Sequence, residues 1–165
     1  MLVLKALVTL MLIVLLLAAI LLVVGQLGLL AGKRPIDLGV RDGQLKPAPM
    51  TPNAVSSQAA NPGHFIEPFR YGGDGAEAFA RLRDLVASWQ GAQIVAESAD
   101  YLHAELTTPW LRFVDDVEFL LDVGRGVIDV RSASRIGYSD LGTNRDRVEA
   151  IRRRFGLGVT PAIGP

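Results

Sequence analysis

The run Ala6–Val24 contains a single polar side chain, Thr9, and it constrains the fold more than any other feature of the chain. As a helix with a rise of about 1.5 Å per residue it would be about 28 Å long, close to the roughly 30 Å hydrocarbon core of a bilayer. Cleaved signal peptides usually have shorter apolar cores, of about 7–15 residues, and residues 28–31 form only a poor cleavage site. We therefore expect residues 1–31 to be a retained transmembrane anchor that contacts the lipid bilayer through Ala6–Val24.

The charges that flank this anchor give opposing indications of its orientation. Lys5 precedes the apolar run whereas Lys33 and Arg34 follow it, so a count of nearby positive charges slightly favours a cytoplasmic C-terminal side. A short N-terminal tail with one lysine is instead typical of a signal anchor, which leaves its N-terminus inside the cell. We expect a single-pass protein and favour an extracytoplasmic position for its folded domain.

Residues 32–63 are expected to form a linker, because five of the nine prolines lie there and proline fixes φ and removes an amide donor. Within it, Thr51–Gln58 is rich in short polar side chains that favour turns. Two interpretations stay open for Asn53, Ser56 and Ser57: an ordered turn that docks on the domain, or direct contact with a ligand. Neither serine lies in a Gly-x-Ser-x-Gly elbow, which argues against a catalytic nucleophile.

Residues 64–156 have the pattern of a globular α+β domain. A capping box at residues 74–77 and an apolar stripe over residues 79–89 predict a helix that ends near Gly91. Period-two alternation then predicts four strands in a mainly antiparallel sheet, at residues 93–97, 101–106, 112–121 and 127–132. A closing helix, with Val148, Ile151 and Phe155 in its apolar stripe, is expected to end at Gly156, and residues 157–165 are expected to be a flexible tail.

Composition excludes several kinds of partner. The 17 Lys and Arg residues balance 17 Asp and Glu residues, and the part beyond residue 40 is slightly acidic, unlike a nucleic-acid-binding domain. The chain has no cysteine, which excludes disulfides and thiolate chemistry. His64 and His103 do not suggest a zinc site, and His103 is expected to be exposed or simply hydrogen-bonded. Asp115, Asp116 and Glu118 are expected on a solvated strand face rather than around a metal. No metal, cofactor or nucleic acid is predicted.

A polar stretch, Arg131–Arg147, joins the last predicted strand to the closing helix. The helix N-terminus, capped by Thr143 or Asn144, would lie beside Arg135 and Arg145, an arrangement that favours an anionic ligand or lipid headgroup. The alternative is that these arginines pair with neighbouring aspartates and tie the loop to the sheet. The candidate ligand-binding residues are Asn53, Ser56, Ser57, Ser132, Ser134, Arg135, Ser139, Asp140, Asn144 and Arg145.

The chain carries two motifs, Thr51–Ser57 upstream and Arg131–Arg145 downstream. Together they resemble the domain of unknown function 1499 family over roughly residues 45–156. Members are bacterial or plastid proteins, often with a secretory or membrane-anchoring N-terminus, so the resemblance implies the bacterial envelope and the cell inner membrane. The family has no established activity that would assign a catalytic residue. Met50 and Ala54 stand where members commonly have cysteines, so a disulfide or thiol role in relatives does not apply here.

Three functions are compatible with these observations. We favour a non-enzymatic module that binds a ligand or a membrane-protein partner. The alternatives are a hydrolase or transferase that uses Ser, Asp and Arg of the two motifs, with Asp140 as base, and a purely structural accessory subunit. A cleft that gathers Asn53, Ser56, Arg135, Asp140 and Asn144 would favour the first two. If the charged side chains of Arg131–Arg147, the joint between the last strand and the closing helix, all pair with one another and leave no cleft, the third function would be favoured.

Overall fold

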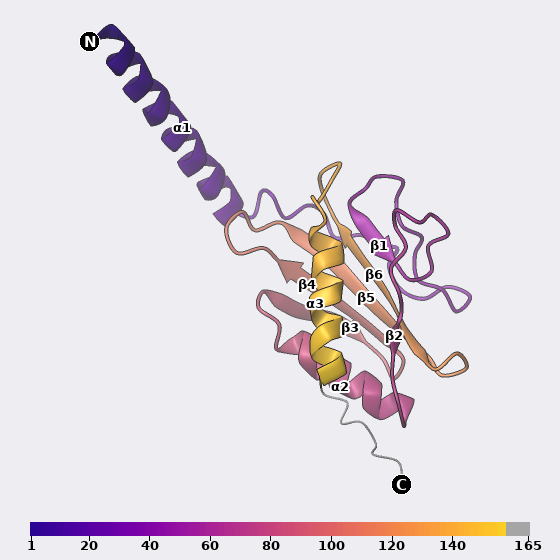
Figure 1. Ribbon diagram of the computed structural model, residues 1–165. Coiled ribbons are helices and arrows are strands. Elements are labelled where there is room, and N and C mark those ends of the chain that lie inside the picture. The colour runs from indigo at the N-terminus through magenta and orange to yellow at the C-terminus, as the bar shows by residue number, and fades with distance from the viewer. Residues whose placement is uncertain (158–165) are drawn as a thin grey trace.

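The chain begins with a long apolar helix, α1 (Leu2–Gln26), which projects away from a folded domain (Figure 1). Its length and composition allow it to cross a bilayer, and a signal sequence would have the same properties. Gly25 is buried at its end, where an added Cβ would lie 2.6 Å from the Leu111 carbonyl oxygen, and Gln26 donates a hydrogen bond to the Trp110 carbonyl. The end of α1 is therefore docked on the domain.

The domain is α+β, as the sequence predicts, and the computed structural model describes residues 1–157; the expected tail from residue 158 onward lies outside the described residues. Its strands are β1 (Ala54–Ser56), β2 (Phe69–Arg70), β3 (Ala92–Glu97), β4 (Tyr101–Thr107), β5 (Val114–Asp122) and β6 (Val127–Ser134), and its helices are α2 (Gly75–Ala87) and α3 (Thr143–Leu157). The sheet is antiparallel in the order β1-β6-β5-β4-β3, with β2 also paired to β6.

Four of these strands are the predicted ones, and β1 and β2 are additions to the prediction. They have three and two residues, so neither is long enough to show an alternating pattern. The predicted third strand is also shorter than expected, because β5 begins at Val114 rather than at Arg112. Asp74 is confirmed as the N-cap of α2, since its carboxylate accepts a hydrogen bond from the Glu77 amide at 2.9 Å.

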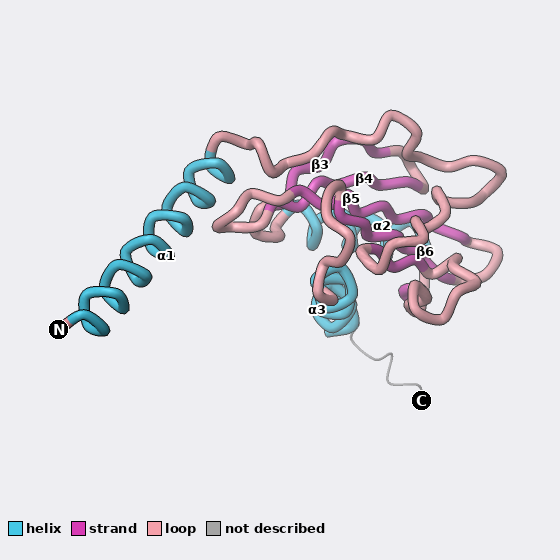
Figure 2. Tube along the Cα trace, turned by 90° about the horizontal axis from the view of Figure 1, so that it is seen from above, coloured by secondary structure: helices cyan, strands magenta, loops and turns pink. Residues whose placement is uncertain are grey.

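Helices α2 and α3 cover one face of the sheet and form the hydrophobic core with it (Figures 1 and 2). Phe69 of β2 is fully buried and makes edge-to-face contacts with Phe119 of β5 and Phe155 of α3, with ring centroids 5.7 and 5.8 Å apart. Val117, Phe119 and Val130 point to this face, as the alternating pattern predicts. A single apolar core thus joins the sheet and both helices.

The opposite face of the sheet lies under the segment that connects α1 to β1 (Figure 2). The Gly39 amide donates to Glu118 of β5 at 2.9 Å, and Leu45 is buried where its amide bonds Gln58. Arg41 and Gln44 form a small turn in between. The segment is extended, as its prolines predict, but it lies along the domain instead of hanging free.

Gly91 sets the tight connection between α2 and β3. Its φ is +78°, and a Cβ added there would lie 2.3 Å from the Thr107 carbonyl oxygen, while its own carbonyl accepts a hydrogen bond from the Thr107 amide. Both the left-handed backbone and the close approach of β4 require glycine.

We expect Gly91→Ala to lower the free energy of unfolding by at least about 1–2 kcal/mol, the cost of a left-handed non-glycine residue, with the overlap adding to it. Gly124→Ala, in the exposed β5–β6 turn without a positive φ, is the matched control and should change stability little. Urea unfolding of the two variants in detergent would measure this difference. Equal stabilities would contradict the role assigned to Gly91.

Candidate functional site

The polar joint between β6 and α3 is built around Asn144, whose side chain is fully buried. Its two amide protons are shared among three acceptors: the Asn53 carbonyl at 3.0 Å, the Ser134 hydroxyl at 2.9 Å and the Asp140 carboxylate at 2.7 Å. Its amide oxygen accepts hydrogen bonds from the Ser132 hydroxyl and from the Arg147 guanidinium. Every polar atom of this side chain is therefore engaged inside the protein.

Asp140 caps the start of α3, a role that the sequence assigned to Thr143 or Asn144. Its carboxylate accepts hydrogen bonds from the Asn144 amide at 2.7 Å and from the Gly142 amide at 3.1 Å. The prediction of the capping residue was wrong because Asn144 turns its side chain into the domain instead of towards the helix end. The exposed N–H groups that would attract an anion already face a carboxylate.

The upstream motif docks on this joint through Asn53. The Asn53 carbonyl accepts from the Ser134 amide at 3.0 Å, and its side-chain amide donates to the Gly137 carbonyl at 2.8 Å. The Thr51 hydroxyl in turn donates to the Asn53 side-chain oxygen. The two motifs, about 90 residues apart in the sequence, thus form one hydrogen-bonded unit.

A cavity of about 280 Å³ opens between this joint and the loop that connects β4 to β5. Its apolar lining comes from Phe113, Val114, Ile136 and Leu141 together with Gly137, and its polar lining comes from Thr108, Asp115, Ser134, Ser139, Asp140 and Thr143. Three candidate residues line it directly, namely Ser134, Ser139 and Asp140. The lining from the β4–β5 loop is not predicted from the sequence, where the only local signal is a bend at Pro109.

The hydroxyl groups along this cavity have protons to donate. The oxygens of Ser134 and Ser139 accept hydrogen bonds from Asn144 and from the Leu141 amide, whereas the Thr143 hydroxyl has no partner in the described part of the chain. Within residues 1–157 no acceptor takes the proton of any of the three. The cavity therefore combines an apolar wall with hydroxyl donors.

The other candidate residues lie elsewhere. Arg145 donates to the carbonyls of Gly63 and Phe65 and borders a separate cavity of about 100 Å³. Ser57 donates to Asp129 at 2.7 Å and accepts from the Val130 amide, which makes it a buried structural contact. Ser56 borders a third cavity, of about 290 Å³, beside the buried His64. The predicted set does not form one site.

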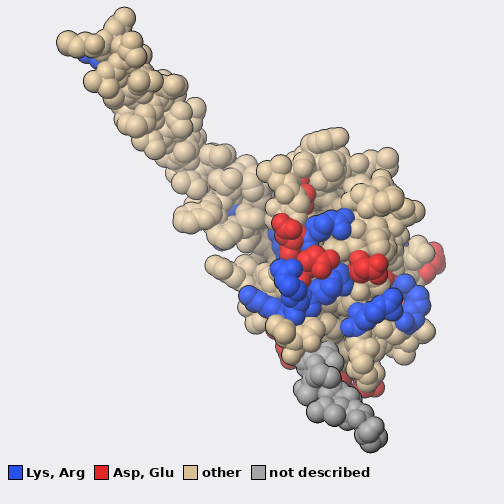
Figure 3. Space-filling model, viewed as in Figure 1, with Lys and Arg blue, Asp and Glu red and all other residues tan. Residues whose placement is uncertain are grey.

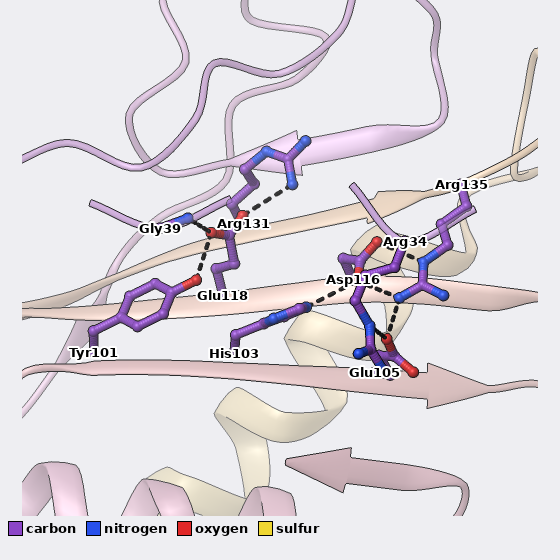
Figure 4. A network of polar contacts seen from close by, with 9 residues as sticks. All are labelled: Arg34, Gly39, Tyr101, His103, Glu105, Asp116, Glu118, Arg131 and Arg135. Atoms are coloured by element: carbon purple, nitrogen blue, oxygen red, sulfur yellow. Dashed lines mark hydrogen bonds and ion pairs between the residues drawn. The ribbon is translucent and has the colours of Figure 1, made fainter. Parts of the chain in front are cut away.

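Arg135 points to the opposite face of the sheet, where it belongs to a buried cluster of ion pairs (Figure 4). Its guanidinium donates two hydrogen bonds to Asp116, both at 2.8 Å, and a further one to Glu105. Arg34, from the segment that follows α1, also pairs with Glu105, and His103 donates to Asp116 at 2.8 Å. The cluster thus joins β4, β5 and the start of the β6–α3 loop to the segment that follows α1.

A second part of the same face is organised by Glu118, which is fully buried. It accepts hydrogen bonds from the Arg131 guanidinium at 3.0 Å, the Tyr101 hydroxyl at 2.8 Å and the Gly39 amide (Figure 4). Burial, followed by the nearby Glu118 carboxylate, raises the pKa of the Tyr101 hydroxyl. Tyr101 therefore acts as a permanent donor to the carboxylate.

The expectation that Asp115, Asp116 and Glu118 are solvated is wrong, because all three are buried. Asp115 lies on the helix-covered face and pairs with Arg147 of α3, and the other two lie under the connecting segment. Within residues 1–157, no three His, Asp or Glu side chains are arranged to hold a metal ion. The carboxylates serve as partners for arginines.

These ion pairs set the protonation of the carboxylates. Burial on its own would raise the pKa of Asp116, but hydrogen bonds from Arg135 and His103 outweigh it and hold this pKa below its ordinary value. Glu105 behaves in the same way, since the hydrogen bonds from Arg34 and Arg135 lower its pKa against the effect of burial. Both groups are charged at neutral pH.

An antiparallel α+β domain with an N-terminal apolar helix and two interlocked polar motifs defines the class of the protein. Residues 44–155 match the family described as "Protein of unknown function (DUF1499)", and the chain belongs to this family. The resemblance drawn from the motifs is confirmed. Comparison with the curated proteins and with the solved structures gives no match.

Asp116→Asn should lower the free energy of unfolding at pH 7 by about 3 kcal/mol, because it removes the main partner of the buried Arg135 guanidinium. The wild-type protein should also lose stability as the pH falls below about 4–5, since its unfolded chain then binds more protons than its folded state. This dependence should be shallower in the variant.

Urea unfolding between pH 3 and pH 6 measures both effects, and Asp84→Asn is the control because the Asp84 side chain is exposed. Parallel pH profiles for the wild-type protein and Asp116→Asn would contradict the contribution assigned to this carboxylate.

Proposed function

We propose that the protein is a membrane-anchored, non-enzymatic module that binds a small uncharged amphiphile in the cavity between the β4–β5 loop and the joint. The observation that carries this proposal is the lining of the cavity. Phe113, Val114 and Ile136 offer apolar contacts, and the free hydroxyl protons of Ser139 and Thr143 offer hydrogen bonds to an ester, ether or hydroxyl oxygen. This combination suits a molecule with a short polar group and an acyl chain.

An uncharged ligand is favoured over the anion suggested by the sequence, because the arginines of the joint have other partners. Arg135 pairs with Asp116 and Glu105, and Arg145 donates to backbone carbonyls. The cavity instead carries the carboxylates of Asp115 and Asp140 in its lining, which disfavours a negative group.

The two alternatives receive less support. A hydrolase would need an available base, whereas the Asp140 carboxylate already accepts from the amides of Asn144 and Gly142 and from the Asn144 side chain. No histidine of residues 1–157 lines this cavity. A purely structural role agrees with the internal hydrogen bonds of Asn53, Ser132 and Asn144, but it gives no reason for the open cavity beside them.

We further propose that α1 stays as an inner-membrane anchor and places the domain on the extracytoplasmic side. Lys5 precedes the helix and Lys33 and Arg34 follow it, so the positive-inside bias towards a cytoplasmic domain amounts to a single charge. The short N-terminal stretch with one lysine is typical of a signal anchor, which leaves its N-terminus inside the cell. A signal-anchor orientation becomes the simpler reading.

Ligand binding can be tested with a monoacylglycerol that carries a photoreactive diazirine in its acyl chain. We expect its cross-links in the full-length protein in nanodiscs to map to residues 108–115 and 134–143. Thr143→Trp, which fills the cavity without breaking a hydrogen bond of the described chain, should reduce this labelling by at least about tenfold, or about 1.4 kcal/mol in binding. Val123→Trp on the exposed β5–β6 turn is the control. Labelling confined to α1, or unaffected by Thr143→Trp, would refute the site.

The orientation can be tested in intact cells because the chain has no native cysteine. Ser88→Cys introduces one thiol at the exposed end of α2, and a membrane-impermeant maleimide should label it before lysis. The cysteine-free wild-type protein gives the background. Labelling that requires lysis would instead place the domain in the cytoplasm and overturn this part of the proposal.

A further inference from the structure

The domain exposes large apolar side chains on two loops, and α1 continues into a third exposed apolar segment. Trp110 of the β4–β5 loop is 75% exposed, and Tyr138 and Leu141 of the β6–α3 loop are 76% and 94% exposed. Leu27 and Leu29, just after α1, are 70% and 69% exposed. Soluble surfaces rarely gather such side chains without a partner.

These segments meet at one end of the domain. The end of α1 packs on Leu111, Gln26 bonds the Trp110 carbonyl, and Gly32 lies against the side chains of Arg135 and Ile136. Figure 1 shows both loops at the end of the domain from which α1 leaves. In Figure 3 this end is mostly free of charged side chains, which gather further down over the helices.

Leu141 borders the 280 Å³ cavity, but its side chain is not packed inside the domain. Its φ is +54°, a left-handed conformation that glycine, asparagine and aspartate adopt more readily than leucine. Its side chain is almost wholly exposed, so packing inside the domain does not offset the strain. A strained and exposed leucine at the tip of a loop indicates contact with something outside the domain.

We propose that this rim, defined as residues 108–113 and 136–141, rests in the interfacial layer of the bilayer that holds α1. Trp110 and Tyr138 would lie at headgroup level, where aromatic residues are enriched, and Leu141 would reach the acyl boundary. The exposed Arg112 and Lys33 on the same end would contact anionic headgroups. The partner is the lipid surface itself, and the docked end of α1 supplies the argument for it.

Contact of the rim with the bilayer does not require a ligand in the cavity. Entry of a ligand from the bilayer, by contrast, rests on the proposed function. Ile136 and Leu141 belong both to the rim and to the lining of the 280 Å³ cavity. A bilayer amphiphile would therefore enter the cavity without crossing water.

The test uses the full-length protein in vesicles of phosphatidylcholine and phosphatidylglycerol. Leu141→Cys carries an NBD fluorophore, and Val123→Cys, at an exposed apolar position in the β5–β6 turn, carries the same label as control. We expect a blue-shifted emission at position 141, several-fold stronger quenching by headgroup-level nitroxide lipids than at position 123, and weaker quenching by iodide. Equal behaviour of the two labels would overturn the proposal. Protection from iodide without nitroxide quenching would assign the rim to a second copy of the chain and overturn it as well.

A second variant separates insertion from mere proximity to the anchor. In a Trp89→Phe background Trp110 is the single tryptophan, and its quenching by brominated lipids reports its depth. Leu141→Asp should fold, since aspartate tolerates the left-handed backbone, but its charge should reduce this quenching at least twofold. Val123→Asp should leave it unchanged. If the quenching of Trp110 does not change in Leu141→Asp, the β6–α3 loop that carries Leu141 is not inserted in the bilayer.

Discussion

The arrangement of the molecule depends on one constraint, which is that carboxylates removed from water must find charged or hydrogen-bonding partners. The outer face of the sheet buries four of them, Glu105, Asp116, Glu118 and Asp129. Part of the pairing comes from side chains of the sheet and its loops, namely Tyr101, His103, Arg125, Arg131 and Arg135. Further hydrogen bonds and ion pairs come from the segment between α1 and β2, through Arg34, the Gly39 amide, Ser57 and Gln58. The segment is thus held across the sheet by the charges that it covers. The polar face of the sheet is therefore buried, like the apolar face on the other side.

The helix-covered face of the sheet buries polar groups that need partners at one end only. Most of it is apolar, but near the start of α3 it carries Asp115 and Ser132, which Arg147 and Asn144 satisfy. Because Asn144 also bonds Asn53, the two motifs and the helix form one rigid support. The cavity of the proposed site lies against this support, and Asn144, which does not line the cavity, holds the Ser134 hydroxyl of its wall in place.

Sequence periodicity predicts which side chains share a face, but not what covers that face. The alternation of Val117 and Phe119 with Asp116 and Glu118 correctly separates an apolar from a polar side of β5. The polar side was expected in water because the covering segment contains no periodic pattern. Ser134 and Arg135 were grouped in one site because the fourth strand was predicted to end at residue 132; β6 in fact continues to Ser134, and the two side chains point to opposite faces. The β4–β5 wall of the cavity is different, since only the folded chain brings it near residues 134–143.

If α1 spans a membrane, as proposed, its docking bears on how the domain is placed relative to the bilayer. The residues from 27 to 53, fully extended, would span on the order of 90 Å and would let the domain range far from its anchor. Instead, Gly25 sits against Leu111, Arg34 is paired with Glu105, and Gly39 is bonded to Glu118. Each contact shortens the reach of the segment, and together they hold one end of the domain beside the end of the helix. The length of this segment therefore serves to cover the sheet rather than to extend the reach of the domain. In the proposed membrane-anchored state, the same contacts fix which loops lie closest to the bilayer.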